Sequence, residues 1–344
     1  MKFLRIIHLG KWLSTLALLW IAAGGAWAAG KSCNRGFVVF AGEDQRGKVV
    51  FAMETTRSQG SWWDWTQASQ AVWLYEEAVG WAKLKKPYGH AFRGSDERRI
   101  GGEWECQLYQ GYQPKMAIHS NENGIHLSLQ ADQVAVKGKS RDGQIVVANG
   151  TGQMTWKSRR LKGRVFLRDA VHMGQSASDL YLKAAKGSRL ESAYVSVGNR
   201  GMMSLLRTND PAFANLSNGK GLVLQLDTLN GLVEDLQVEA TGYKRLGLYE
   251  YPTEWQGTFS VDGRQGMFKL STFDTQTTEY LLIGGNRLGW AKGFLCFDGE
   301  SHAVFGLTEV RGSFQGRKEI EEDESKSRPA QETQPGTSWD ALLH

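Results

Sequence analysis

Apolar and polar residues alternate along most of the chain, in short runs separated by turn-forming residues. Two such runs, 35–42 and 48–55, flank a polar turn, and two more, 115–120 and 124–130, flank the turn Asn-Glu-Asn-Gly. Alternation with a period of two is typical of strands with one buried face, and turns of this kind join antiparallel neighbours. The pattern predicts two β-hairpins in the first half of the chain.

Runs of the same kind continue to about residue 311, and about sixteen or more short strands are expected. Abundant Gly (41 residues) and scarce Pro (6 residues) suit strands joined by tight turns. So many strands exceed what one small barrel needs. The sequence therefore predicts an all-β, mainly antiparallel protein of two successive barrels or sandwiches, a first β domain at 29–175 and a second at 176–316.

One segment departs from the alternation and predicts a helix packed on the first β domain, near residues 65–84. Asp64 can cap its start, with Gln67 completing a capping box, and Pro87 ends the run. Its apolar residues recur at helical spacing: Trp65, Ala68, Val72, Tyr75, Val79 and Ala82.

The first 28 residues have the pattern of a secretory signal peptide. Lys2, Arg5 and Lys11 precede an apolar run at 12–23, and Ala26–Ala28 supplies small residues for cleavage. We expect export to the periplasm and no permanent membrane span after processing. Retention of the segment as an anchor is the alternative, although the run is short for a bilayer.

Residues 317–344 are predicted to form a disordered acidic tail, since they hold seven acidic and four basic residues and little apolar surface. The whole chain has a formal net charge of +5. Its basic residues are not clustered strongly enough to indicate a nucleic-acid partner.

Three cysteines follow the signal segment, so an oxidising compartment allows one disulfide and leaves one thiol. All three pairings are open. The pairing we expect is Cys33–Cys106, because both residues lie beside polar or turn-forming residues. Cys296 is surrounded by apolar residues and is expected to be a small buried hydrophobe.

No short catalytic, metal-binding or cofactor-binding motif stands out, so the catalytic residues are unknown and neither a metal nor a cofactor is expected. The Asn-Glu-Asn-Gly turn places His119 opposite His126. Two imidazoles on one sheet face could hold a metal with Glu122 or Glu103. An exposed polar pair of a hairpin is the favoured interpretation.

Aromatic residues are the remaining candidates for a functional site. Buried, they would pack a core or line a pocket; exposed, they would stack on sugar rings. The candidate ligand-binding residues are Trp62, Trp63, Tyr75, Trp255 and Trp290.

Three stretches, 37–56, 150–167 and 289–310, follow one another in an order that resembles double lipocalin-like proteins of the carotenoid 1,2-hydratase type. The resemblance implies two successive lipocalin-like barrels and an apolar substrate that enters between or within them. No catalytic acid of that family can be matched to a residue here. The expected helix and the acidic tail depart from its pattern.

The leading hypothesis is an exported β protein that binds, and in one version transforms, an apolar or amphipathic small molecule such as a lipid or isoprenoid. A second is an envelope glycan-binding or glycan-cleaving β-sandwich that uses Glu103, Glu105 or Glu254. A third is a structural or assembly factor whose tail at 317–344 contacts an envelope protein.

Overall fold

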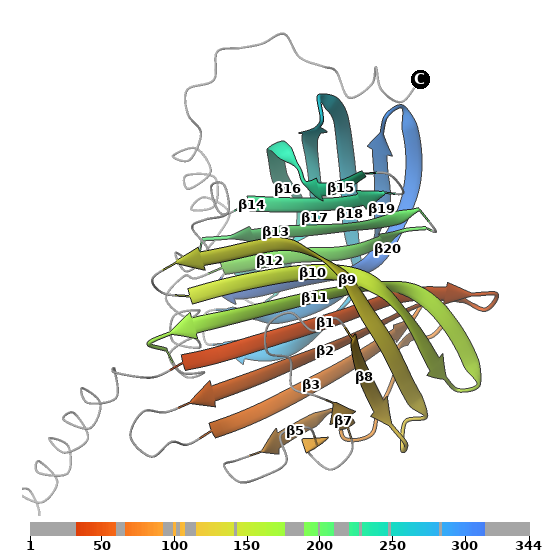
Figure 1. Cartoon of the computed structure of the whole chain (residues 1–344), viewed down its shortest axis with the longest axis vertical. Helices are drawn as coiled ribbons and strands as arrows, with labels where there is room; N and C mark the ends of the chain where they lie inside the picture. The colour runs from red at the N-terminus through yellow and green to blue at the C-terminus, as the bar shows by residue number, and fades with distance from the viewer. Residues whose placement is uncertain are drawn as a thin grey trace, which may run out of the picture.

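A computed structural model describes residues 32–59, 66–91, 99–100, 104–106, 115–140, 143–175, 189–198, 200–209, 220–226, 229–246, 249–281 and 284–313. This part of the chain is all-β and forms two antiparallel sheets (Figure 1). No helix of a length and hydrophobicity that would cross a bilayer occurs in it.

The first sheet has 11 strands in the order β4-β3-β2-β1-β11-β10-β9-β8-β7-β6, with β5 paired to β3. Its strands are β1 (Ser32–Asp44), β2 (Gly47–Gln59), β3 (Thr66–Glu76), β4 (Gly80–Trp81), β5 (Tyr88–Ala91), β6 (Arg99–Ile100), β7 (Trp104–Cys106), β8 (Lys115–Ser120), β9 (Ile125–Ser140), β10 (Gly143–Trp156) and β11 (Arg159–Met173).

The second sheet has 9 strands in the order β15-β14-β13-β12-β20-β19-β18-β17-β16. Its strands are β12 (Arg189–Val197), β13 (Gly201–Thr208), β14 (Lys220–Leu226), β15 (Leu229–Leu232), β16 (Glu234–Leu246), β17 (Tyr249–Val261), β18 (Arg264–Leu281), β19 (Gly284–Phe297) and β20 (Glu300–Ser313). The order pairs the first strand with the last, as β1 pairs with β11 in the first sheet.

Both hairpins predicted from alternation are confirmed. β1 pairs with β2 through the turn after Asp44, and β8 pairs with β9 through the Asn-Glu-Asn-Gly turn. Their alternate side chains separate as expected for strands, because successive residues point to opposite faces. On β1, Val38 and Phe40 face the core of the first sheet, whereas Phe37 and Val39 face the second sheet.

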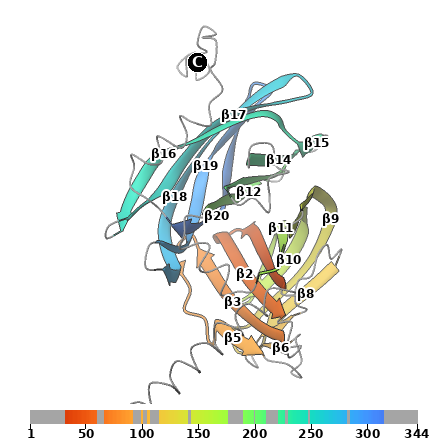
Figure 2. The same ribbon diagram turned by 90° about the vertical axis from the view of Figure 1, so that its left-hand side faces the viewer.

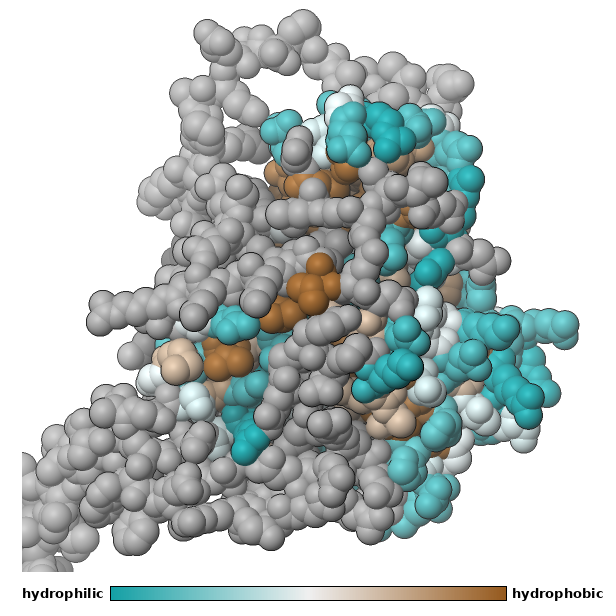
Figure 3. Space-filling view, viewed as in Figure 1, coloured by the Kyte–Doolittle hydropathy of each residue, from teal (hydrophilic) through white to brown (hydrophobic). Residues whose placement is uncertain are grey.

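Each sheet curls around a core of its own, and the two sheets pack against each other (Figure 2). Residues of both sheets form a third apolar cluster, in which Phe37 and Phe166 of the first sheet meet Tyr194, Phe305 and Leu307 of the second. Where the two sheets meet, the middle parts of the strands are therefore buried on both faces. Away from this contact, Figure 3 shows hydrophilic residues gathered along the right-hand edge of one face.

The prediction of a helix near residues 65–84 is wrong, because most of that segment lies in strand β3. Val72 and Leu74 join the core of the first sheet, whereas Trp73 and Tyr75 on the opposite face pack against the second. A strand that is buried on both faces is apolar at nearly every position. Such a run also contains helical spacings, so periodicity alone cannot identify it.

Gly306 tests the packing of β20 on β12. A Cβ atom at this position would overlap the carbonyl oxygen of Tyr194 on the neighbouring strand. Backbone atoms in a ladder cannot move aside cheaply, so we expect Gly306→Ala to lower the free energy of unfolding by about 2–4 kcal/mol. Urea unfolding followed by circular dichroism measures this difference.

Gly299→Ala is the matched control, because Gly299 lies in the turn before β20 and has no neighbouring atom within 4 Å of an added Cβ. Its positive φ of 78° limits the expected loss to about 1 kcal/mol. Equal losses in the two variants would contradict the packing of β20 on β12.

Candidate functional site

The concave face of the second sheet carries a buried carboxylate. Glu191 on β12 is 3% exposed and lies on the same face as Ala193 and Val195, which belong to the core of this sheet. A carboxylate in such a position is costly unless hydrogen bonds and opposite charges compensate for lost water.

Three donors provide that compensation. The Glu191 Oε2 atom accepts a hydrogen bond from Trp255 Nε1 at 2.9 Å and one from Arg207 Nη1 at 3.4 Å. Its Oε1 atom lies 3.2 Å from Arg189 Nε. Hydrogen bonds from charged donors are about twice as strong as neutral ones, so the two arginines offset much of the cost of burying this side chain.

The contact with Trp255 depends on the curl of the sheet. Trp255 lies on β17, and three strands (β18, β19 and β20) separate β17 from β12 in the sheet order. In a flat sheet these two strands would lie roughly 19 Å apart, at about 4.8 Å per strand. The hydrogen bond at 2.9 Å therefore closes the concave face across its width.

A second buried cation lies in the same cross-strand row as Glu191. The register pairs Arg207 with Glu191, Glu191 with Val310, and Val310 with Arg287. The guanidinium of Arg287 stacks over the Tyr251 ring at 4.2 Å, and the residue is 8% exposed. Its Nη2 atom has no hydrogen-bond partner among the described residues.

Polarity changes along this face. Near the charged group, the Tyr251 hydroxyl lies 3.3 Å from Thr275 Oγ1. Farther along the strands the buried side chains of this face are mainly apolar, and Phe259 stacks on Phe297 with ring centroids 5.9 Å apart. The face is thus charged at one end and apolar at the other.

The predicted aromatic candidates occupy different places. Trp255 lies on the concave face just described. Tyr75 and Trp290 come together in the contact between the sheets, where their rings stack at 4.8 Å. Trp62 and Trp63 lie outside the described residues, as does the expected helix cap Asp64.

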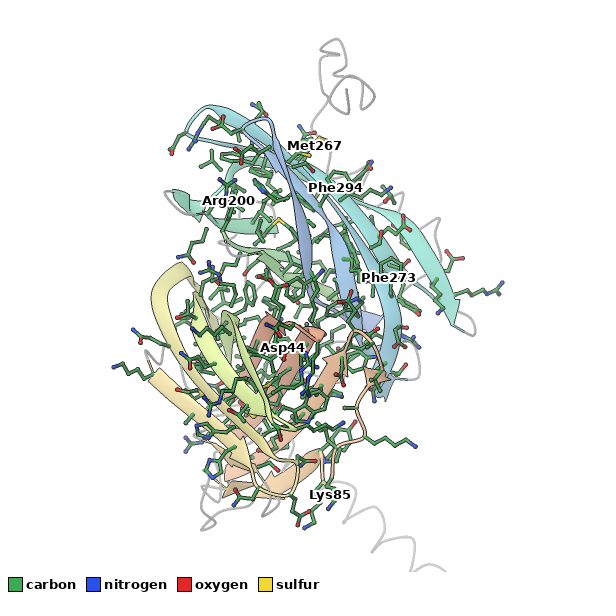
Figure 4. The ribbon with its side chains drawn as sticks, turned by 90° about the vertical axis from the view of Figure 1, so that its right-hand side faces the viewer. Asp44, Lys85, Arg200, Met267, Phe273 and Phe294 are labelled. Atoms are coloured by element: carbon green, nitrogen blue, oxygen red, sulfur yellow. The ribbon has the colours of Figure 1, made fainter. Side chains whose placement is uncertain are left out.

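The Tyr75–Trp290 stack continues into a small aromatic group. Trp81 packs edge-on against Tyr75 at 5.2 Å and donates a hydrogen bond to the Asp274 carbonyl oxygen at 2.5 Å. Burial, together with the nearby charge of Asp274, raises the pKa of Tyr75. Phe273, labelled in Figure 4, pairs with Trp290 and is 51% exposed. The rings of Tyr75, Trp81 and Trp290 pack the two sheets together, whereas Trp255 belongs to the core of the second sheet.

The histidine pair and the acidic candidates are not assembled into one site. His119 lies opposite His126 as predicted, with ring centroids 6.2 Å apart. Within the described residues, no group of three or more His, Cys, Asp or Glu side chains is placed to hold a metal. Glu105 lies on β7 of the first sheet and Glu254 on β17 of the second, while Glu103 is outside the described residues.

The cysteines give no disulfide among the side chains that the structure describes. Cys33 is fully buried at the start of β1, and the side chain of Cys106 lies outside the described set. The pairing of these two residues stays a prediction. Cys296 on β19 is partly buried, whereas the sequence predicts a small buried hydrophobe at this position.

A groove of about 690 Å³ lies on the first sheet, over strands β8 to β11. Most of its lining side chains are polar and exposed, including Lys115, Ser128, Gln130 and Lys162. Sites for apolar ligands are lined mainly by apolar and aromatic side chains, and the residues on the concave face of the second sheet match that description better.

Sequence reasoning missed a buried ion pair between the two sheets. Arg168 Nη1 on β11 donates to Glu309 Oε2 on β20 at 2.6 Å, and Glu309 is 0% exposed. Ser192 donates to the same carboxylate at 3.1 Å, and Arg311 lies 3.1 Å from its other oxygen. Arg311 also contacts Glu54 at 2.7 Å, which links the pair to β2.

Opposing effects set the charge of this pair. Burial alone would raise the pKa of Glu309, but the charges of Arg168 and then Arg311 outweigh burial and lower that pKa to about 2. Burial lowers the pKa of Arg168, and the charge of Glu309 more than reverses this effect. A sequence signal existed, because charged residues interrupt otherwise apolar strands, but it could not identify partners 141 positions apart.

Comparison with known proteins gives a likeness of fold. No protein-family model matches the chain, and no curated protein matches it by sequence. A crystal structure of a Nitrosomonas europaea protein, provisionally assigned as AttH, has a TM-score of 0.52 at 14% identity and covers 82% of this chain and 93% of its own.

A second similar structure is kievitone hydratase from Nectria haematococca, with a TM-score of 0.49 at 12% identity, covering 81% of this chain and 89% of its own. The likeness to the Nitrosomonas structure shows a shared fold and nothing of activity. It agrees with the two-part β architecture that the resemblance to double lipocalin-like proteins implies.

The pKa of Glu309 predicts how stability depends on pH. Because the folded value is about 2 and the ordinary value 4.5, the stabilisation is fully present above pH 4.5 and is lost as the pH falls toward 2. Glu309→Gln should lower the free energy of unfolding at pH 7 by about 3–5 kcal/mol and should lose less stability than wild type between pH 4.5 and 2. Urea unfolding at a series of pH values measures both effects.

Glu300→Gln is the matched control on the same strand. Glu300 also contacts an arginine, Arg200, but both side chains are at least half exposed. Exposed ion pairs contribute about 0–1 kcal/mol, so this variant should behave nearly as wild type does. A similar loss in both variants would show that the buried pair has no special role.

Proposed function

We propose that this protein binds a small amphipathic molecule, such as a lipid or isoprenoid, on the concave face of the second sheet. The observation that carries the proposal is the buried Glu191–Arg207–Trp255 group at one end of an otherwise apolar face. Sites for small ligands are mostly apolar with a few fixed polar groups that orient the ligand.

The fold does not need the buried charges of Glu191 and its arginines for stability. Replacing buried charges by apolar side chains of similar size is often neutral or stabilising. A core built for stability alone would continue the pattern of Phe259, Phe268 and Leu270 to the end of the strands. The cost of burying Glu191 and its arginines is explained by a ligand whose polar end they recognise.

Trp255 joins the two parts of the proposed site. Its ring belongs to the apolar core, while its Nε1–H donates to Glu191. An indole can therefore pack against the apolar part of a ligand and hold the polar group in place at the same time. Of the three predicted candidates that the structure describes, Trp255 is the one that lies on this face.

We also propose that the chain is exported to the periplasm, on the evidence of the signal-peptide pattern in residues 1–28. A binding protein suits such a location, because free apolar molecules partition out of water.

Trp255→Phe tests the binding site. The phenyl ring keeps much of the apolar contact but removes the hydrogen bond to Glu191, so we expect binding of dodecan-1-ol to weaken about tenfold or more, equivalent to about 1.4 kcal/mol. Native mass spectrometry identifies copurified lipid, and displacement of a fluorescent probe gives the affinity.

Trp156→Phe is the control, because Trp156 is an equally buried tryptophan in the core of the first sheet. It should bind dodecan-1-ol as wild type does. If the wild-type protein carries no lipid and binds neither dodecan-1-ol nor a panel of other single-chain amphiphiles, the proposed function is wrong.

Export is tested by expressing the full chain in a Gram-negative host and measuring the intact mass of the product in the periplasmic fraction. We expect a chain that begins at residue 29 or 30, since small residues precede the expected cleavage site. Full-length protein held in the inner membrane would support the anchor alternative instead.

A further inference from the structure

We infer that the polar end of the bound molecule is an anion, a carboxylate or phosphate, and that Arg287 binds it. The inference rests on the proposed function and specifies its ligand class. It starts from the charge balance on the concave face of the second sheet, where Glu191 is accompanied by Arg189, Arg207 and Arg287. These four side chains carry a net charge of −1 + 3 = +2.

Glu191 cannot neutralise all three arginines. Its two oxygens already receive donors from Arg189, Arg207 and Trp255. Arg287 lies two strands away in the same row, and its cross-strand neighbours Val310 and Thr277 are uncharged. The buried group therefore retains positive charge at the position of Arg287.

Arg287 differs from three other buried arginines in the described part of the chain. Arg168 is paired with Glu309, and Arg311 with Glu54. Arg159 is held by Asp44 at 2.5 Å and also by Glu76. Each of these cations meets a carboxylate of the chain itself, as buried charges generally must.

Within the described part of the chain, Arg287 contacts an aromatic ring instead of a carboxylate. Stacking on Tyr251 at 4.2 Å occupies the flat face of the guanidinium and leaves its edge for hydrogen bonding. Its Nη2 atom is buried and has no hydrogen-bond partner among the described residues. The N–H groups along a guanidinium edge match the two oxygens of a carboxylate or phosphate.

The arrangement thus assigns the ends of the ligand. An anionic head would contact Arg287, and an apolar chain would extend toward the phenyl rings of Phe259 and Phe297. A neutral alcohol or hydrocarbon would leave the Arg287 cation without a counter-charge. The site should therefore discriminate between ligands by the charge of the head and not by the chain alone.

Three ligands with the same chain test the inference: dodecanoic acid, dodecyl phosphate and dodecan-1-ol, each titrated into the purified protein at pH 8. Wild type should bind at least one of the two anions ten times or more as tightly as the alcohol. The anion that binds more tightly tells which head group the site prefers. In Arg287→Gln the preference for anions should disappear, while affinity for the alcohol stays within about threefold.

Arg264→Gln is the matched control, because Arg264 also lies over a phenyl ring of this sheet, that of Phe297 at 5.0 Å, but its side chain is 40% exposed. It should keep the wild-type preference. If wild type binds the alcohol as tightly as both anions, or if folded Arg287→Gln keeps the preference, the inference is overturned while the proposed function stands. If no ligand binds, the proposed function itself fails.

The wild-type comparison needs no variant, so it tests the inference even where Arg287→Gln does not fold. Arg287→Lys is a second variant that keeps the positive charge without the planar fork. We expect it to retain part of the preference for anions, since charge remains but bidentate geometry is lost. Complete loss in a folded Arg287→Lys would point to packing on Tyr251 instead of charge.

Discussion

The two curled sheets bury their outer faces against each other, and this contact constrains most of the molecule. The middle parts of strands β1, β11, β12 and β20 lie between two cores and are buried on both faces. A polar side chain buried at this contact is shielded from water and needs a partner within the protein. Arg168 and Glu309 are partners of this kind, with Nη1 and Oε2 2.6 Å apart. Two apolar surfaces can pack in several relative positions, but Arg168 and Glu309 can form their ion pair in few of them. The pair therefore favours a single arrangement of the two sheets.

The same two-sided burial decides how much of the fold was readable from the sequence. Where one face is exposed, as in β8 and β9, alternation identified both strands and their turn. In β3 both faces are covered, so Ala71, Trp73 and Tyr75 fill the positions between the residues of the first core. The apolar run then matched a helical stripe as well as a strand. Whether such a segment is a helix or a strand depends on the strands beside it, and periodicity does not reveal those neighbours.

The candidate site was partly predictable for a related reason. Trp255 was expected to contact a ligand because it is aromatic, and it lies on the concave face. Glu191, Arg207 and Arg287 were not singled out, since up to 96 residues separate them and pairing across four strands brings them into one row. A charged residue inside an apolar strand was the available signal. The same signal applies to Glu309. Glu191 lies on the concave face of the second sheet and Glu309 on the face that contacts the first sheet, and only the structure shows this difference.

The two buried charged groups differ in what they leave unsatisfied. At the contact between the sheets, Arg168 and Arg311 both meet Glu309, and Arg311 also meets Glu54. Two carboxylates balance two guanidinium groups there, as a structural role requires. On the concave face, one carboxylate stands beside three guanidinium groups, and the edge of Arg287 has an unpartnered N–H among the described residues. A bound anion would remove this imbalance of charge, and the proposed ligand class follows from that difference between the two groups.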